Sequence, residues 1–266
     1  MRLKGKSRVK NALYRVYMRR LRAGLEGRPT PQHVAMIIDG NRRWAKQLGH
    51  ESAAFGHRAG ADKMMEFLGW CDRAGVERVT LYLLSIDNLT GRSSEELSDL
   101  VEIIADLARR IAANTRWRVQ QVGQKEPLPE QLAATLTEVE AATAGRECGS
   151  GQGLHVNLAV GYGGRNEIVD AIRRIVNKHA EDGESLEALA ARITPELIGE
   201  HLYTGGQPDP DLVIRTSGEQ RLSDFMLWQS AHSEFYFVEA LGPDLREVDF
   251  LRALRDFAGR QRRFGH

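Results

Sequence analysis

The most informative residues of the chain form a short polar segment behind an apolar run. The run is 34–38, and directly after it the sequence reads Asp39-Gly40-Asn41-Arg42-Arg43-Trp44. The apolar run predicts a buried strand and Trp44 begins a helical pattern, so the polar residues lie between a strand end and a helix N-terminus. Backbone N–H groups at such an N-terminus bind anions, and one arginine guanidinium can donate two parallel hydrogen bonds to phosphate oxygens. Because a divalent cation can bridge a carboxylate to a phosphate, the segment predicts a metal-assisted site for a phosphorylated or diphosphorylated ligand.

This segment also has a plainer interpretation, since Asp-Gly pairs form ordinary turns and adjacent arginines often lie on a solvated surface. A second basic segment favours the binding interpretation. It follows the apolar residues 212–214 without a break and reads Arg215-Thr216-Ser217-Gly218-Glu219-Gln220-Arg221-Leu222-Ser223. Two guanidinium groups with hydroxyl and backbone donors can hold a diphosphate. A surface loop with scattered charges is the alternative, but Arg215 directly follows a predicted strand, which argues against it.

A third polar segment follows the apolar run 79–84. A plain polar loop before a helix near Glu95 would look the same, with a serine as its cap. The segment nevertheless offers a hydroxyl, a carboxamide, an acid and an arginine. The residues of this segment that we expect at the site are Ser85, Ile86, Asp87, Asn88 and Arg92.

Two isolated residues could join these segments. His57 follows the first segment closely enough to contact a phosphate. Glu234 lies among aromatic and apolar residues, and a buried acid needs a partner, for which a metal ion or an arginine would serve equally well. The stretch Gly161-Tyr162-Gly163-Gly164-Arg165 lacks the spacing of a dinucleotide-binding loop, and we expect it to form a tight strand-to-helix turn.

Apolar runs of strand length alternate with helical patterns along the chain. The expected strands are 34–38, 79–84, 117–122, 154–160, 212–214 and 235–238. The clearest helical patterns are 59–74, 95–113, 129–144, 166–180 and 248–260. This alternation predicts a single α/β domain with a mainly parallel central sheet of about six strands, flanked by helices. Ligands bind at the carboxyl ends of the strands in such sheets, where Asp39, Ser85, Gly161 and Arg215 would share one edge.

The composition narrows the class of protein. The chain has 266 residues, of which 42% are hydrophobic and 27% charged, enough for one large domain or two small ones. A net charge of +1 gives no overall field that would favour nucleic acid. Cys71 and Cys148 are too few for a disulfide framework and suit a reducing cytoplasm. No apolar run is long enough to span a membrane, and we expect no signal peptide.

Residues 1–28 differ from the rest of the chain, because they hold ten Lys and Arg residues and one acid, Glu26. Apolar residues recur among them at near-helical spacing. A basic amphipathic helix of this kind can lie on an anionic membrane surface, although a helix docked on the protein body with its basic face in solvent fits as well. We therefore divide the chain into an N-terminal arm, residues 1–28, and one domain, residues 29–266.

Taken together, the motifs resemble those of the cis-prenyltransferases, a family that includes the undecaprenyl diphosphate synthases. Segments 39–44 and 215–223, followed by Trp228-Gln229 and Glu234, match in order and spacing from about His33 to the C-terminus. The resemblance implies that residues 29–266 form a catalytic domain that condenses isopentenyl diphosphate with an allylic diphosphate and makes a new cis double bond. It also implies Mg2+ as cofactor and a homodimer in the cytoplasm.

The resemblance implies a role for each matching position. Asp39 would hold Mg2+ and assist loss of the allylic diphosphate, and Glu234 would complete the metal site from the other subunit. Asn88, with Ser85 nearby, matches the position proposed to help remove the proton. The residues that would bind the allylic substrate are Gly40, Asn41, Arg42, Arg43 and Trp44. Those that would bind isopentenyl diphosphate are Arg215, Arg221, Leu222 and Ser223.

The chain departs from the family pattern at four places. An arginine usual before the position of His57 is missing from a segment that is one residue longer, Leu89 stands where long-chain members have Trp, and Gly91 is an apparent insertion before Arg92. Leu83 stands where long-chain members carry a small residue, beside the tunnel for the growing chain. A packed wall yields little to added bulk, so Leu83 predicts a short product. The simplest such product is C15 (2Z,6E)-farnesyl diphosphate made from geranyl diphosphate.

Other functions stay open at this point. A long-chain polyprenyl diphosphate synthase for cell-wall lipid carriers would differ in product length alone. A non-catalytic accessory subunit would tend to lose the aspartate and arginines, which are present here. The near-neutral body argues against a nucleic-acid binder, and the absence of an Asp-Asp-x-x-Asp motif argues against an all-helical trans-prenyltransferase.

Overall fold

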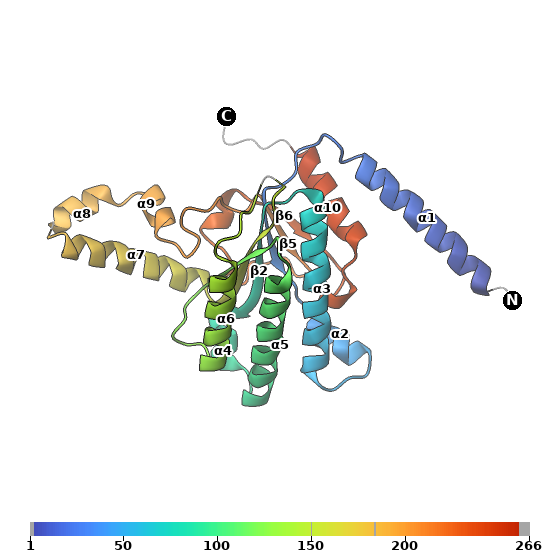
Figure 1. Ribbon diagram of the computed structural model, residues 1–266, viewed down its shortest axis with the longest axis horizontal. Coiled ribbons are helices and arrows are strands. Elements are labelled where there is room, and N and C mark those ends of the chain that lie inside the picture. The colour runs from blue at the N-terminus through green and yellow to red at the C-terminus, as the bar shows by residue number, and fades with distance from the viewer. Residues whose placement is uncertain (1–2, 150, 184, 261–266) are drawn as a thin grey trace.

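The computed structural model describes residues 3–149, 151–183 and 185–260, and its centre is one six-stranded parallel sheet (Figure 1). The strands lie in the order β3-β4-β2-β1-β5-β6, and each neighbouring pair is parallel. The strands are β1 His33–Ile37, β2 Arg78–Ser85, β3 Arg118–Val122, β4 His155–Tyr162, β5 Leu212–Arg215 and β6 Glu234–Phe237. The predicted α/β class and all six predicted strands are confirmed.

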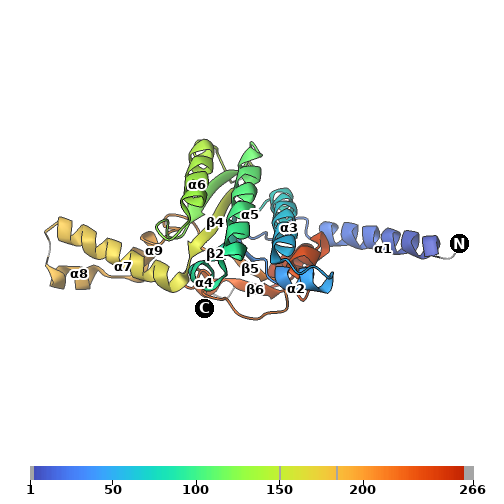
Figure 2. The ribbon, with the colours of Figure 1, turned by 90° about the horizontal axis from the view of Figure 1, so that it is seen from below.

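Helices cover one face of this sheet (Figure 2). Val34 and Met36 of β1 face the large apolar core beneath them, and Ala35 and Ile37 face a smaller cluster on the other side. The second face is covered by the chain between β4 and β6, with Phe225 at its centre, rather than by a full layer of helices. The helices of the first face are α3 Ala53–Ala74, α5 Ser94–Ala113, α6 Glu130–Thr143 and α10 Glu247–Gly259.

The short helices lie in the connections. The structure corrects the expected loop after β2 to a helix, α4, and adds two helices that the periodicity did not predict, α8 and α9. The bounds are α2 Asn41–Gln47, α4 Ile86–Gly91, α8 Leu186–Arg192 and α9 Pro195–Glu200, with 3-10 turns at Gln229–His232 and Gly242–Asp244. Two of them, α2 and α4, directly follow β1 and β2 and so bring their residues to the carboxyl edge of the sheet.

Two helices project from the body in both views, α1 Leu3–Ala23 and α7 Gly164–Glu181 (Figures 1 and 2). Met18 and Leu21 of α1 are buried, and α1 lies against α10, so the C-terminal part of the arm docks on the protein. Leu13 and Val16 of the same helix are exposed. Within the described residues, no helix has the length and apolar character needed to cross a membrane. Residues 1–2 of the predicted arm and 261–266 of the predicted domain lie outside the described residues.

A buried network of neutral polar groups joins the strands near their amino ends. His33 Nδ1 donates to the Pro208 carbonyl at 2.8 Å, so His33 Nε2 accepts from the Thr80 hydroxyl, also at 2.8 Å. Thr80 in turn accepts from Asn157, which also donates to Gln207 at 2.7 Å. Burial lowers the pKa of His33 to about 4, so its ring is neutral at physiological pH.

A β-bulge interrupts β2 close to its carboxyl end. Tyr82 pairs with Ala159 of β4 and Leu84 pairs with Val160, so Leu83 has no partner opposite it. Bulges re-aim the side chains around them. Around the bulge, four successive residues of β2, 82–85, line the same cavity, which is described below.

Candidate functional site

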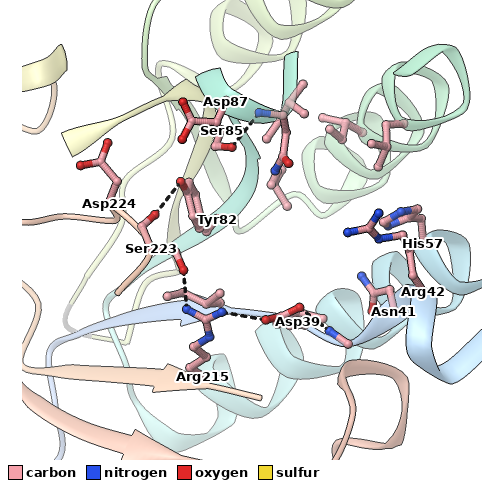
Figure 3. Close-up of a pocket in the computed structure, with 18 of the residues that line it drawn as sticks. Asp39, Asn41, Arg42, His57, Tyr82, Ser85, Asp87, Arg215, Ser223 and Asp224 are labelled. Atoms are coloured by element: carbon pink, nitrogen blue, oxygen red, sulfur yellow. Dashed lines mark hydrogen bonds and ion pairs between the residues drawn. The ribbon is translucent and has the colours of Figure 1, made fainter. Parts of the chain in front are cut away.

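The site is a cavity of about 960 Å³ at the carboxyl ends of β1, β2 and β5 (Figure 3). Its mouth is charged and its back is apolar. The predicted site residues that line it are Asp39, Gly40, Asn41, Arg42, Arg43, His57, Leu83, Ser85, Asp87, Asn88, Arg92, Arg215, Arg221 and Ser223. Segments that are far apart in the sequence therefore meet at one place, as parallel strands require. Gly161, which was expected at the same edge, does not line the cavity.

Asp39 and Arg215 form the centre of the mouth because β1 and β5 are neighbours. Arg215 Nη2 donates to Asp39 Oδ2 at 2.7 Å, and Gly40 N donates to Oδ1 at 2.6 Å. The Arg215 side chain is 4% exposed and that of Asp39 is 35% exposed, so the carboxylate faces the cavity. Burial alone would raise the pKa of Asp39, but the hydrogen bonds from Arg215 and Gly40 outweigh it and hold the pKa below its usual value. Asp39 is therefore an anion that can bind a cation.

The Arg215 guanidinium also organises the second basic segment. Its Nη1 donates to the Arg221 carbonyl at 2.5 Å and to Ser223 Oγ at 2.7 Å. Its Nε is buried and has no partner among the described residues. A buried donor without a partner is costly, so the placement of this guanidinium is not explained by its own hydrogen bonding alone.

The turn at Gly40 requires glycine. Its φ is 93°, and a Cβ there would lie 2.7 Å from Leu241 Cδ2. The turn leads into α2, whose first residue, Asn41, lies in a slot left by two glycines of α3: a Cβ on Gly56 would lie 2.1 Å from the Asn41 backbone oxygen, and one on Gly60 would lie 2.6 Å from its amide. The predicted helix after this segment is confirmed, but it begins at Asn41 rather than at Trp44, so Asn41, Arg42 and Arg43 lie in its first turn. Close packing of α3 on α2 fixes this start.

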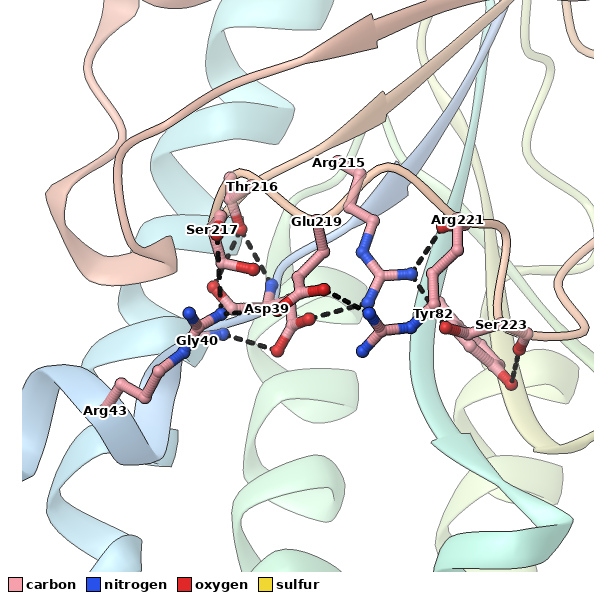
Figure 4. A network of polar contacts seen from close by, with 10 residues as sticks. All are labelled: Asp39, Gly40, Arg43, Tyr82, Arg215, Thr216, Ser217, Glu219, Arg221 and Ser223. Atoms are coloured by element: carbon pink, nitrogen blue, oxygen red, sulfur yellow. Dashed lines mark hydrogen bonds and ion pairs between the residues drawn. The ribbon is translucent and has the colours of Figure 1, made fainter.

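Two arginines of the mouth share one carboxylate (Figure 4). Arg43 of α2 lies 3.6 Å from Glu219, and Arg221 donates to the other oxygen of the same group. Arg43 and Arg221 come from the first and the second basic segment, respectively. Glu219 thus links the two segments that the sequence predicted to bind anions.

A second charged group lies on the α5 side of the mouth. Arg92 contacts Glu96, and His57 Nε2 lies 3.5 Å from the same glutamate. Burial lowers the pKa of His57, and the nearby Arg92 lowers it further. The apparent insertion of Gly91 does not remove Arg92 from the site.

Helix α4 presents the third polar segment. Ser85 caps the helix, since its Oγ accepts a hydrogen bond from Asn88 N at 3.1 Å. The side chains of Asp87 and Asn88 belong to the cavity lining. Ser85 therefore both caps α4 and lines the cavity.

The apolar back of the cavity was largely missed by sequence reasoning. Leu83 lies in this wall, as expected. The strand segments also contribute Ile37, Ile38 and Leu84. The apolar residues from α3 and α5 are Ala61, Met64, Leu100, Ile103, Ile104 and Leu107. Their i, i+3, i+4, i+7 spacing is the pattern of a core-facing helix, which predicts burial and does not distinguish a core from a cavity wall. Tyr82, Arg165, Asn166, Asp224 and Leu227 also line the cavity and were not predicted.

Four predicted residues do not line the cavity. Trp44 stacks on Phe55 and donates to Asp244 at 3.0 Å. Leu222 packs into the smaller apolar cluster, and Ile86 lies against the Gly163 turn. Glu234 begins β6, at the amino edge of the sheet and opposite Asp39, where it pairs with Arg260. The partner of Glu234 within this chain is thus an arginine, and one chain cannot bring Glu234 and Asp39 to one metal ion.

The donor set of the mouth fits Mg2+ in a particular way. Among the described residues, no group of three His, Cys, Asp or Glu side chains could hold a metal ion. Asp39 is a single ionised carboxylate beside arginines suited to phosphate oxygens. Mg2+ in proteins is commonly bound by one or two carboxylates plus substrate phosphates and water, so a lone Asp39 suits Mg2+ that arrives with a diphosphate.

Comparison with known proteins identifies relatives of the whole chain. The sequence family described as putative undecaprenyl diphosphate synthase matches residues 37–265. An isoprenyl transferase of Streptomyces avermitilis is 54% identical over 97% of this chain and 98% of its own length. A (2Z,6E)-farnesyl diphosphate synthase of Thermobifida fusca is 54% identical over 95% of this chain and 97% of its own length.

A solved structure shares the fold. The crystal structure of lavandulyl diphosphate synthase from Lavandula x intermedia, in complex with dimethylallyl diphosphate, superposes with a TM-score of 0.81. It is 36% identical and covers 89% of this chain and 99% of that chain. The central sheet and the segments at its carboxyl edge therefore belong to a shared architecture.

Proposed function

The chain belongs to the cis-prenyltransferase family, and from this premise we propose that it condenses isopentenyl diphosphate with geranyl diphosphate to give (2Z,6E)-farnesyl diphosphate. The observation that carries the proposal is the cavity itself, in which Asp39 and Arg215 lie at one end and apolar side chains line the other. Diphosphates match the charged end, and hydrocarbon chains match the apolar end.

The two basic segments divide the substrates between them. Gly40, Asn41, Arg42 and Arg43 bind the allylic diphosphate, with His57 and Arg92 beside it. Arg215, Arg221 and Ser223 bind the diphosphate of isopentenyl diphosphate. Asp39 would hold Mg2+, which would supply positive charge against the negative charge that grows on the leaving diphosphate. The apolar wall excludes water from the carbocation that remains, and isopentenyl diphosphate then forms the new carbon–carbon bond and loses a proton.

Asn88 is the residue that we assign to the proton-loss step. It lines the cavity beside Ser85 and Asp87. Because the carboxamide of Asn88 is neutral, it orients the substrate, and the released diphosphate is a suitable acceptor for the proton. Asp39 and Asn88 are thus the two catalytic residues of the proposal.

Leu83 supports the short product. It lies in the cavity wall between Tyr82 and Leu84, where a small residue would leave more space. Three carbons of extra bulk in a packed wall shorten the space for a growing chain. A long-chain product would therefore require the Leu83 side chain to move out of the path of the growing chain.

Assembly and location are parts of the same proposal. Glu234 reaches a metal site only in a partner subunit, which favours a homodimer. Exposed apolar residues of α7, Val169, Ile172 and Val176, lie on the projecting helix and suit such an interface. We place the enzyme in the cytoplasm, with the arm, residues 1–28, in peripheral contact with the inner face of the membrane through its basic and apolar side chains.

Product analysis tests the function directly. The purified protein is incubated with Mg2+, labelled isopentenyl diphosphate and geranyl diphosphate, and the dephosphorylated products are sized. A C15 alcohol of Z geometry is the expected result. A ladder of C50 or longer chains would retain the chemistry and overturn the short product, and no incorporation with any allylic primer would overturn the proposed reaction.

A further inference from the structure

The loop that carries Ser223 has an unusual backbone. Ser223, Asp224 and Met226 have φ values of 51°, 63° and 48°, in the left-handed region that residues other than glycine rarely adopt. Such conformations persist where the surrounding structure holds them, and they are common at ligand sites. The contacts that hold this loop therefore bear on the site.

Tyr82 holds the loop from the β2 side (Figure 3). Its hydroxyl donates to the Ser223 carbonyl at 3.1 Å, and its ring stacks on Phe225 with centroids 4.5 Å apart. Burial raises the pKa of Tyr82 to about 12, so the hydroxyl keeps its proton and donates throughout the physiological range.

The start of α7 holds the loop from the other side. Gly164 N donates to the Asp224 carbonyl at 2.8 Å, and Arg165 N donates to Asp224 Oδ1 at 3.2 Å. This approach depends on glycine, because a Cβ on Gly164 would lie 2.8 Å from the Asp224 carbonyl oxygen and one on Gly163 would lie 3.1 Å from its carboxylate. The glycine-rich stretch after β4 therefore makes room for the loop.

The held loop in turn fixes a guanidinium. Arg215 Nη1 donates to Ser223 Oγ and to the Arg221 carbonyl, so displacement of the loop would rotate Arg215. We propose that Tyr82 and the Gly163-Gly164 turn are positioning residues that fix Ser223 and Arg215 and thereby set the affinity of the site for the diphosphate of isopentenyl diphosphate. The inference rests on the proposed function, and it assigns a role to two motifs outside the basic segments.

Tyr82→Phe tests the hydrogen bond, since it removes the hydroxyl and keeps the stacked ring. Loss of one such bond is expected to raise the KM for isopentenyl diphosphate about three- to tenfold, with kcat and the KM for the allylic substrate changed less than twofold. Tyr203→Phe is the matched control, because its hydroxyl donates to Asp170 away from the cavity. Equal increases in both KM values would overturn the inference.

Gly164→Ala tests the same loop from outside the cavity. The added methyl group would displace Asp224 and Leu227, so the KM for isopentenyl diphosphate is expected to rise more than in Tyr82→Phe, again with the allylic KM unchanged. Gly69→Ala is the control, since a Cβ at this helical position meets nothing closer than 3.4 Å. An unchanged KM in Gly164→Ala would contradict the role of the turn.

Binding measurements separate this inference from the proposed function. Titration calorimetry with isopentenyl diphosphate, without an allylic substrate, gives Kd for the unaltered protein and for Tyr82→Phe without any turnover. A three- to tenfold weaker Kd in the variant supports the positioning role. Equal Kd values overturn this inference alone, and absence of binding by the unaltered protein overturns the proposed function and this inference together.

Discussion

The charged mouth and the apolar back of the cavity differ in how their side chains are packed and paired. At the mouth, Asp39 faces the open cavity, and the buried Nε of Arg215 has no partner in the part of the chain that the structure describes; neither feature is explained by packing or stability. At the back, Met64, Ile104 and Leu107 pack as core residues do. Under the proposed function, the mouth would bind the diphosphate groups of the substrates, and the back would limit the length of the product.

The largest expected effect comes from removing the charge at the mouth. Asp39→Asn keeps the shape of the side chain but loses the negative charge that would hold Mg2+, so kcat is expected to fall about 100- to 1,000-fold. Incorporation of labelled isopentenyl diphosphate measures the loss, and thermal unfolding checks that the fold persists. Activity within tenfold of the unaltered protein would contradict the role of Asp39.

The buried network around His33 differs from the mouth, because both ring nitrogens of His33 have hydrogen-bond partners. In the unfolded chain a histidine binds a proton near pH 6.5, but His33 stays neutral in the folded protein until about pH 4. The unfolded state therefore binds more protons between these values, and the free energy of unfolding is expected to fall by about 3 kcal/mol as the pH drops from 6.5 to 4.

Urea unfolding at pH 7.5, 6 and 5 measures this dependence. His33→Gln is expected to be less stable at pH 7.5 but to lose less stability on acidification, since the titrating ring is gone. An identical pH dependence in both proteins would show that His33 does not govern acid stability.

At the back of the cavity, Leu83→Ala is expected to change the product rather than the rate. Space gained in the wall lets the chain grow beyond C15, whereas the first condensation stays within a fewfold of the original rate. The sizes of the dephosphorylated products measure the shift. Leu81→Ala is the matched control, because Leu81 is fully buried but does not line the cavity: it should destabilise the fold by about 2–5 kcal/mol and leave the product at C15. A C15 product from Leu83→Ala would contradict the proposal that Leu83 limits the length of the product.

The smallest expected effect lies at the rim of the mouth. Glu219 pairs with Arg43 and Arg221, whose side chains are half exposed or more, and exposed ion pairs contribute about 0–1 kcal/mol. Glu219→Gln frees both guanidinium groups for diphosphates, so Kd for inorganic diphosphate should fall up to about fivefold. Weaker binding in calorimetry would indicate instead that Glu219 orients Arg221.

The comparison also explains what the sequence could predict. The six strands were predictable because buried parallel strands are continuous apolar runs. The mouth was predictable because Asp39 and Arg215 break those runs at their ends. The helices α8 and α9 were missed although Ser185, Thr194 and Pro195 give start signals, because their short apolar patterns are weak.

The back of the cavity could not be distinguished from a core by pattern alone. Leu100 and Leu107 would have the same spacing on α5 in either case. Trp44 shows the reverse case, since this residue of the predicted binding motif lies outside the cavity lining and stacks on Phe55. Neighbouring residues in one motif can therefore serve different purposes, and only the three-dimensional arrangement separates them.

The bulge in β2 gives the protein a position that can vary independently. Leu83 has no partner in the ladder, so its replacement alters the cavity without disturbing the pairing of Tyr82 with Ala159 or of Leu84 with Val160. Most side chains elsewhere in the sheet pack in one of the two apolar clusters, so their replacement would disturb that packing. In proteins with this fold, a single substitution at this position can thus change the volume of the cavity, while the strands that hold the polar residues of the site keep their pairing.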